Sequence, residues 1–146
     1  MYNLFISYAP DSPENRKSVV EVQAAFDSAQ FKAVVKKAAE SSITELAAAD
    51  IVLFGAEKTG ASDMHSDFTE IARVVKGANL AGKTAGFFSF GSEKASAKLR
   101  KALHDSDISL FDDEPAMGEK GPKPADLKEW AGKLAAFHRG KHGESG

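Results

Sequence analysis

Two short loops carry the residues of this sequence that are best suited to binding a ligand. The first loop follows an apolar run at 51–54, and the second follows an apolar run at 83–88. Their polar, glycine and aromatic residues are Glu57, Lys58, Thr59 and Gly60 in the first, and Phe90, Gly91 and Ser92 in the second. Both runs have the length and composition of buried strands, and an open parallel sheet binds ligands at the carboxyl ends of its strands. The sequence therefore predicts a ligand site where these loops meet.

The elements that position these loops alternate regularly along the chain. Apolar runs predict strands at 4–8, 31–35, 51–54, 84–88 and 108–111. Between them, apolar residues recur every three or four positions, as on one face of a helix. The first such stripe is Val19, Val22, Phe26 and Ala29, and the last is Leu127, Trp130, Ala131, Leu134 and Phe137. Helix starts are indicated by a capping box at 42–45 and by Ser92 as an N-cap.

This alternation predicts a three-layer α/β domain with a doubly wound, five-stranded parallel sheet. The common strand order for such a domain is 2-1-3-4-5, and the right-handed crossover rule leaves few alternatives. We expect a single domain over residues 1–138. The polar, glycine-rich segment 139–146 is expected to be a flexible tail.

Composition narrows the range of functions. The 146 residues carry a net charge of −2, which gives no electrostatic footprint for nucleic acid. No apolar run approaches the ~20 residues needed to cross a bilayer, so no membrane role is expected. The absence of cysteine excludes disulfides, thiolate chemistry and cysteine-ligated metal centres. The first residues do not have the pattern of a signal peptide, and a cytoplasmic location is the expectation.

Four segments, in the same order along the chain, resemble segments of the flavodoxin-like family, in particular of its short-chain type. Segment 48–55 resembles the family's third strand, and 67–71 lies where the family has the helix behind its first flavin loop. Segment 79–88 resembles the leucine-x-glycine-lysine entry to strand four. Segment 124–137 resembles the closing helix. The resemblance covers about two thirds of the chain and implies the flavodoxin-like fold described above.

The resemblance also implies a cofactor and a function. Family members hold FMN in the loops after strands one, three and four and transfer electrons to a redox partner protein, so an electron carrier is implied rather than a substrate-converting enzyme. When the family's binding residues are carried over to this chain, the resemblance implies that the phosphate is bound by Ser7, Ser12 and Asn15. The flavin ring would lie along 57–60, and Phe90 would stack on it beside Gly91 and Ser92.

The loop after the first strand departs from the family pattern. It has no glycine, Pro10 and Pro13 lack the N–H groups that a phosphate needs, and Asp11 and Glu14 would repel one. The same residues also read as an ordinary helix start, with Ser12 or Asp11 as N-cap. The sequence therefore leaves two hypotheses open: an FMN-binding electron carrier, and a flavin-free binding or regulatory module on the same scaffold.

Other candidate sites have weaker support in the sequence. His138 and His142 have metal-ligand spacing but lack a carboxylate partner, and no metal site is predicted. The acidic run 112–114 could bind a cation, as in phosphoaspartyl receiver domains, but the acidic pair and phosphoacceptor of those domains are missing. Segment 4–9 also resembles the opening strand of a TIR domain, although no tryptophan-x-x-glutamate motif follows the third strand.

Overall fold

The computed structural model describes residues 1–58, 65–91, 93–118 and 121–142. Its strands form one parallel sheet in the order β2-β1-β3-β4-β5, which confirms the predicted topology. The strands are β1 (Tyr2–Tyr8), β2 (Phe31–Lys37), β3 (Ile51–Ala56), β4 (Thr84–Ser89) and β5 (Ser109–Leu110). The helices are α1 (Pro13–Ala24), α2 (Ile43–Ala48), α3 (Thr69–Val75), α4 (Ala97–Leu103) and α5 (Pro124–His142), with 3₁₀ turns at Ala38–Glu40, Ser66–Phe68 and His104–Ser106.

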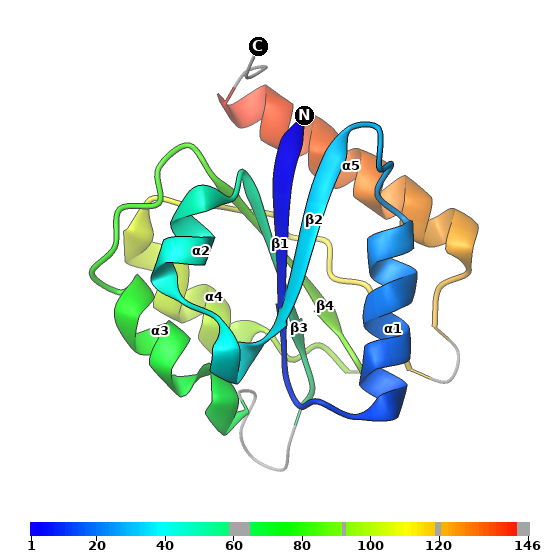
Figure 1. Ribbon diagram of the computed structural model, residues 1–146, viewed down its shortest axis with the longest axis horizontal. Coiled ribbons are helices and arrows are strands. Elements are labelled where there is room, and N and C mark those ends of the chain that lie inside the picture. Colours follow the sequence, from blue (N-terminus) through cyan, green and yellow to red (C-terminus); the bar gives the residue numbers. More distant parts are fainter. Residues whose placement is uncertain (59–64, 92, 119–120, 143–146) are drawn as a thin grey trace.

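Helices cover both faces of the sheet, with α2, α3 and α4 on one side and α1 and α5 on the other (Figure 1). The central strand β3 is buried on both faces, as parallel sheets of this class require. Val52 and Phe54 belong to the core under α2, α3 and α4, whereas Ile51 and Leu53 belong to the core under α1 and α5. In the described residues, no helix combines the length and apolar composition needed to span a bilayer.

Local sequence signals account for two of the helix starts. Ser42 and Glu45 form the predicted capping box at α2. Ser12 caps α1, with Pro13 in the first turn, which confirms the interpretation of this segment as a helix start. The prediction of Ser92 as the cap of α4 is wrong, because that helix begins at Ala97 with Ser96 in the N-cap position.

Three other boundaries differ from the sequence prediction. Helix α1 ends at Ala24, so Ala29 is exposed in a turn instead of facing the core. Strand β5 is reduced to two residues. Helix α5 continues to His142, so residues 139–142 are helical rather than part of a tail. His138, the last residue of the predicted domain, is buried.

Candidate functional site

The carboxyl ends of β1, β3 and β4 lie side by side. Tyr8 stands opposite Gly55 in the β1–β3 ladder. The N–H of Ala9 donates to the carbonyl of Gly55 at 3.1 Å, and the N–H of Phe90 donates to that of Ala56 at 2.9 Å. The chain reverses its winding direction between β1 and β3, and this switch point is where a doubly wound sheet binds its ligand. The topology therefore brings the predicted loops together.

Ser7 does not face this switch point. Its side chain is fully buried, and its hydroxyl is 2.9 Å from that of Ser41, which precedes α2. Because the Ser41 hydroxyl donates to the carbonyl of Lys37 at 2.9 Å, Ser7 is the donor in the first pair. The Ser7 hydroxyl thus ties β1 to the connection between β2 and α2.

Ser12 and Asn15 are engaged in the start of α1. The Ser12 hydroxyl accepts a hydrogen bond from the N–H of Asn15 at 3.1 Å. The Asn15 side chain is buried, and its amide nitrogen donates to the carbonyl of Pro10 at 3.0 Å. These bonds satisfy the first helical turn and fold the loop onto itself.

A carboxylate stands at the centre of the loop after β1. Asp11 accepts a hydrogen bond from the hydroxyl of Tyr8 at 2.9 Å. It also pairs with Arg16 at 3.6 Å and with Lys37 at 3.8 Å. Burial raises the pKa of Tyr8, and the hydrogen bond and charge of Asp11 raise this pKa further. Residues from β1, α1 and β2 therefore surround one negative charge.

The loop after β3 is only partly described. Glu57 is half-buried, and the Nζ of Lys58 lies 3.4 Å from the carboxylate of Glu93, which joins this loop to the one after β4. Thr59 and Gly60 lie outside the described residues. Gly55, at the end of the strand, is required by packing, because a Cβ there would lie 2.5 Å from the ring of Phe88.

The loop after β4 begins with a core residue. Phe90 is 7% exposed and meets the rings of Tyr8 and Phe88 edge-on, with centroids 6.2 and 5.4 Å away. Gly91 has no atom within 4 Å of a would-be Cβ, and Ser92 lies outside the described residues. The buried hydroxyl of Ser89 has no hydrogen-bond partner among the described residues.

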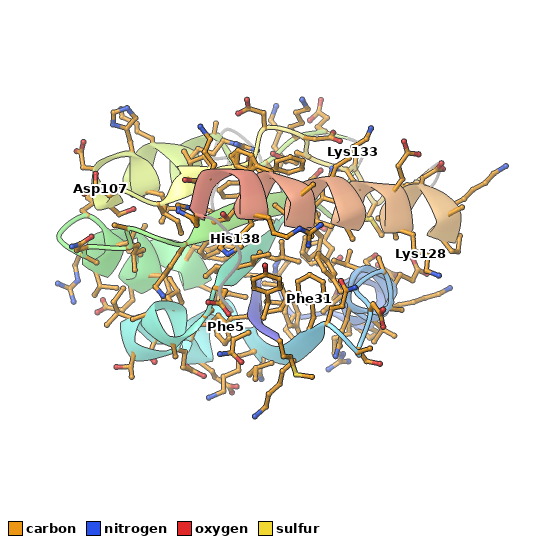
Figure 2. All side chains as sticks on the ribbon, turned by 90° about the horizontal axis from the view of Figure 1, so that it is seen from above. Phe5, Phe31, Asp107, Lys128, Lys133 and His138 are labelled. Atoms are coloured by element: carbon orange, nitrogen blue, oxygen red, sulfur yellow. The ribbon has the colours of Figure 1, made fainter. Side chains whose placement is uncertain are left out.

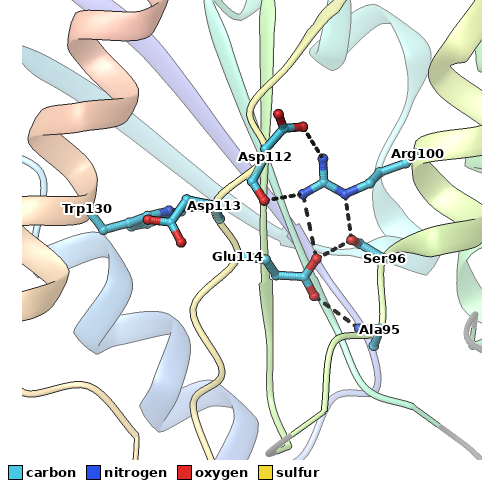
Figure 3. Close-up of polar contacts among 7 residues, drawn as sticks. All are labelled: Ala95, Ser96, Arg100, Asp112, Asp113, Glu114 and Trp130. Atoms are coloured by element: carbon cyan, nitrogen blue, oxygen red, sulfur yellow. Dashed lines mark hydrogen bonds and ion pairs between the residues drawn. The ribbon is translucent and has the colours of Figure 1, made fainter.

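A polar network beside this edge escaped the sequence analysis (Figure 3). The Glu114 carboxylate is buried and accepts hydrogen bonds from the N–H of Ala95 at 3.0 Å and from the Ser96 hydroxyl. Arg100 lies 3.7 Å from the same carboxylate, donates to Ser96 and pairs with exposed Asp112. The network fastens the segment after β5 to the start of α4. Its sequence signal is faint: a serine and an arginine four residues apart, and an acidic run.

The two histidines with metal-ligand spacing, His138 and His142, lie at the end of the sheet opposite to these loops. His138 lies under α5, facing the strands (Figure 2), and its Nδ1 is 2.7 Å from the hydroxyl of Thr84 at the start of β4. His142 is 3.1 Å from the hydroxyl of Ser109. Burial, followed by the neighbouring His142, lowers the pKa of His138. Across the described ranges, no group of three or more His, Asp or Glu side chains could hold a metal ion.

Comparison with solved structures identifies the architecture. A short-chain flavodoxin associated with a non-canonical PDU bacterial microcompartment superposes with a TM-score of 0.79 at 14% identity, covering 94% of this chain and 99% of the other. The chain has the flavodoxin-like fold. A flavodoxin from Streptococcus pneumoniae TIGR4 has a TM-score of 0.77 at 14% identity, over 92% of this chain and 99% of that one.

A third flavodoxin-like structure carries a ligand. The Fusobacterium nucleatum flavodoxin bound to flavin mononucleotide has a TM-score of 0.70 at 11% identity, covering 94% of this chain and 99% of that chain. No protein-family model matches the sequence, and neither does any curated protein. The likeness therefore lies in the fold, and the site must be judged on its own residues.

The loop after β1 does not fit the phosphate of FMN. Ser7, Ser12 and Asn15 already have partners inside the protein, and two prolines remove backbone donors. The carboxylate of Asp11 lies in the same loop beside Tyr8 and Arg16, and it would repel a dianion bound there. The ring loops are less decisive, but Phe90 presents its edge to other rings and is covered by the core.

Proposed function

We propose that this chain is a flavodoxin-like binding module that does not use FMN as a redox cofactor. One observation carries the proposal. The three polar side chains that the family resemblance assigns to the phosphate are bonded within the protein: Ser7 to Ser41, Ser12 to the start of α1, and Asn15 to Pro10. Recruiting any of them for a ligand would break a bond that the fold uses.

The described residues of the ring loops support the same proposal. A flavin ring needs an accessible aromatic or apolar face, whereas the charged Lys58 and Glu93 link the two loops. Phe90 supplies the only aromatic ring of segments 57–58 and 90–91, and this ring is used in the core. We place the module in the cytoplasm, as expected from the sequence; a redox partner protein belongs only to the flavin-binding candidate below.

FMN-dependent electron transfer to a redox partner protein is the second candidate. It is favoured by the similarity in fold to the Fusobacterium nucleatum flavodoxin bound to flavin mononucleotide. The open space at Gly91, where a Cβ would meet no atom within 4 Å, is a further observation in its favour. In this candidate the ring would lie between the loops that hold Glu57 and Phe90, while the flavin itself supplies the redox chemistry.

A visible absorbance spectrum separates the two candidates. The purified protein is measured before and after incubation with excess FMN and gel filtration, with an FMN-binding flavodoxin treated in parallel as positive control. We expect no retained flavin bands and no quenching of FMN fluorescence on titration with the protein. Flavin bands that survive gel filtration at about one FMN per chain would refute the proposal and establish an FMN site, which the second candidate requires.

A further inference from the structure

Three groups from three elements converge on the Asp11 carboxylate. The Tyr8 hydroxyl comes from the end of β1 and donates at 2.9 Å. Arg16 comes from the first turns of α1 and lies 3.6 Å away, and Lys37 comes from the end of β2 and lies 3.8 Å away. A hydroxyl donor, a guanidinium and an ammonium are the groups with which proteins bind phosphate. The arrangement is an anion site that already holds an anion.

Other carboxylates lie near this cluster, but the carboxylate of Asp11 is the one that contacts all three groups. Asp11 is an exposed residue, although only 28% of its side chain is exposed. The nearby Glu14 is exposed, and within the described part of the chain it forms no ion pair with Arg16 or Lys37. Lys37 also contacts Glu40 at 3.4 Å, but the Glu40 side chain is 61% exposed and comes from the rim of the cluster. Asp11 is thus the carboxylate that contacts the hydroxyl and both cations, and Lys37 is shared between Asp11 and Glu40.

We infer that Asp11 fills the anion position of the β1–β3 switch point with its own carboxylate, and that Tyr8, Arg16 and Lys37 form a latent site for a phosphate group. The inference rests on the proposed flavin-free function and names the residue that closes the loop to phosphate. With the carboxylate in place, a phosphate must enter beside a negative charge at contact distance. Without it, the same hydroxyl and cations face an empty position.

Inorganic phosphate is the probe for this inference. Its binding is measured by isothermal titration calorimetry and by the shift of the melting temperature in wild type, Asp11→Ser and Asp11→Asn. We expect no saturable binding to wild type, and saturable binding to both variants with an affinity at least tenfold higher than any shown by wild type. Adding Lys37→Gln to Asp11→Ser should remove this gain.

Glu14→Gln is the matched control, because it deletes one negative charge three residues along the chain, in the first turn of α1, without touching the cluster. It should leave phosphate binding at the wild-type level. An equal gain in Glu14→Gln would overturn the inference, since net charge alone would then explain the effect. The absence of a gain in both Asp11 variants would also overturn it. The isosteric Asp11→Asn decides the matter if circular dichroism shows that Asp11→Ser is unfolded.

The two proposals fail in different ways. Wild-type protein that retains FMN overturns the proposed function, whatever the variants do. A wild-type protein without FMN, combined with Asp11 variants that bind phosphate no better, leaves the proposed function standing and removes the inference.

Discussion

Replacing Glu114 with alanine should lower the free energy of unfolding by about 3–4 kcal/mol. The figure follows from the groups left behind. The N–H of Ala95 and the hydroxyl of Ser96 are both buried and lose their acceptor, at about 1–3 kcal/mol for each unsatisfied donor. Arg100 keeps Asp112 and is 22% exposed, so it adds little. Glu114→Gln retains an acceptor oxygen and should cost about half as much.

Urea unfolding followed by tryptophan fluorescence is a suitable assay, because Trp130 is the only tryptophan and its indole N–H donates to the carbonyl of Asp113 at 2.9 Å. The midpoint should fall by about 2 M urea in Glu114→Ala. Circular dichroism should give the same midpoint if unfolding is two-state. Asp112→Asn is the control, since this side chain is fully exposed, and its midpoint should match that of wild type.

Two results would refute this reasoning. A loss below about 1 kcal/mol in Glu114→Ala would mean that the donors find water or other acceptors easily. Equal losses in Glu114→Ala and Glu114→Gln would mean that the carboxylate contributes through its volume, and that its hydrogen bonds are unimportant.

Three further predictions test other contacts. The lowered pKa of His138 favours its neutral form in the fold, so the stability that this side chain contributes is complete above pH about 6.5 and falls as the pH drops below that value. Urea unfolding at several pH values should show this decrease in the free energy of unfolding. The decrease should be smaller in His138→Asn. Gly55→Ala should destabilise by about 1–3 kcal/mol by overpacking against the rings behind it, whereas Gly91→Ala should have no effect in the same thermal melts; similar effects of the two would contradict the packing argument. Asp11→Asn removes the charge of Asp11 and should lower the pKa of Tyr8 in an ultraviolet titration of a chain whose other tyrosine is replaced by phenylalanine. An unchanged pKa would show that the charge of Asp11 does not act on the Tyr8 hydroxyl.

The sheet could be predicted from the sequence because its signals are local. The run at 51–54 is apolar at every position, and a strand buried on both faces requires that pattern. The capping box of Ser42 and Glu45 needs only residues three apart. Helix ends were harder, because Ala29 continues the helical period by chance after α1 has ended at Ala24.

The site could not be predicted to the same depth, because its residues are defined by partners far along the chain. Ser7 has the composition of a phosphate ligand, but a serine 34 residues away takes its hydroxyl. Three successive acidic residues look alike in the sequence, and only the turn after the short β5 directs Glu114 inward and Asp112 outward. The prediction that Thr59, Gly60 and Ser92 contact a flavin stays untested, since they lie outside the described residues.

The residues of the two halves of the core are complete at different stages of the chain's synthesis. The half under α2, α3 and α4 draws on residues between 5 and 108, so the ribosome has delivered all its parts before α5 exists. The other half sets Leu4 and Ile6 of β1 against Leu127 and Leu134 from the far end of the chain. Until α5 emerges, the face of β1 and β3 that it covers remains apolar and open to association with other nascent chains. Docking of α5 is therefore the event that completes the second half of the core.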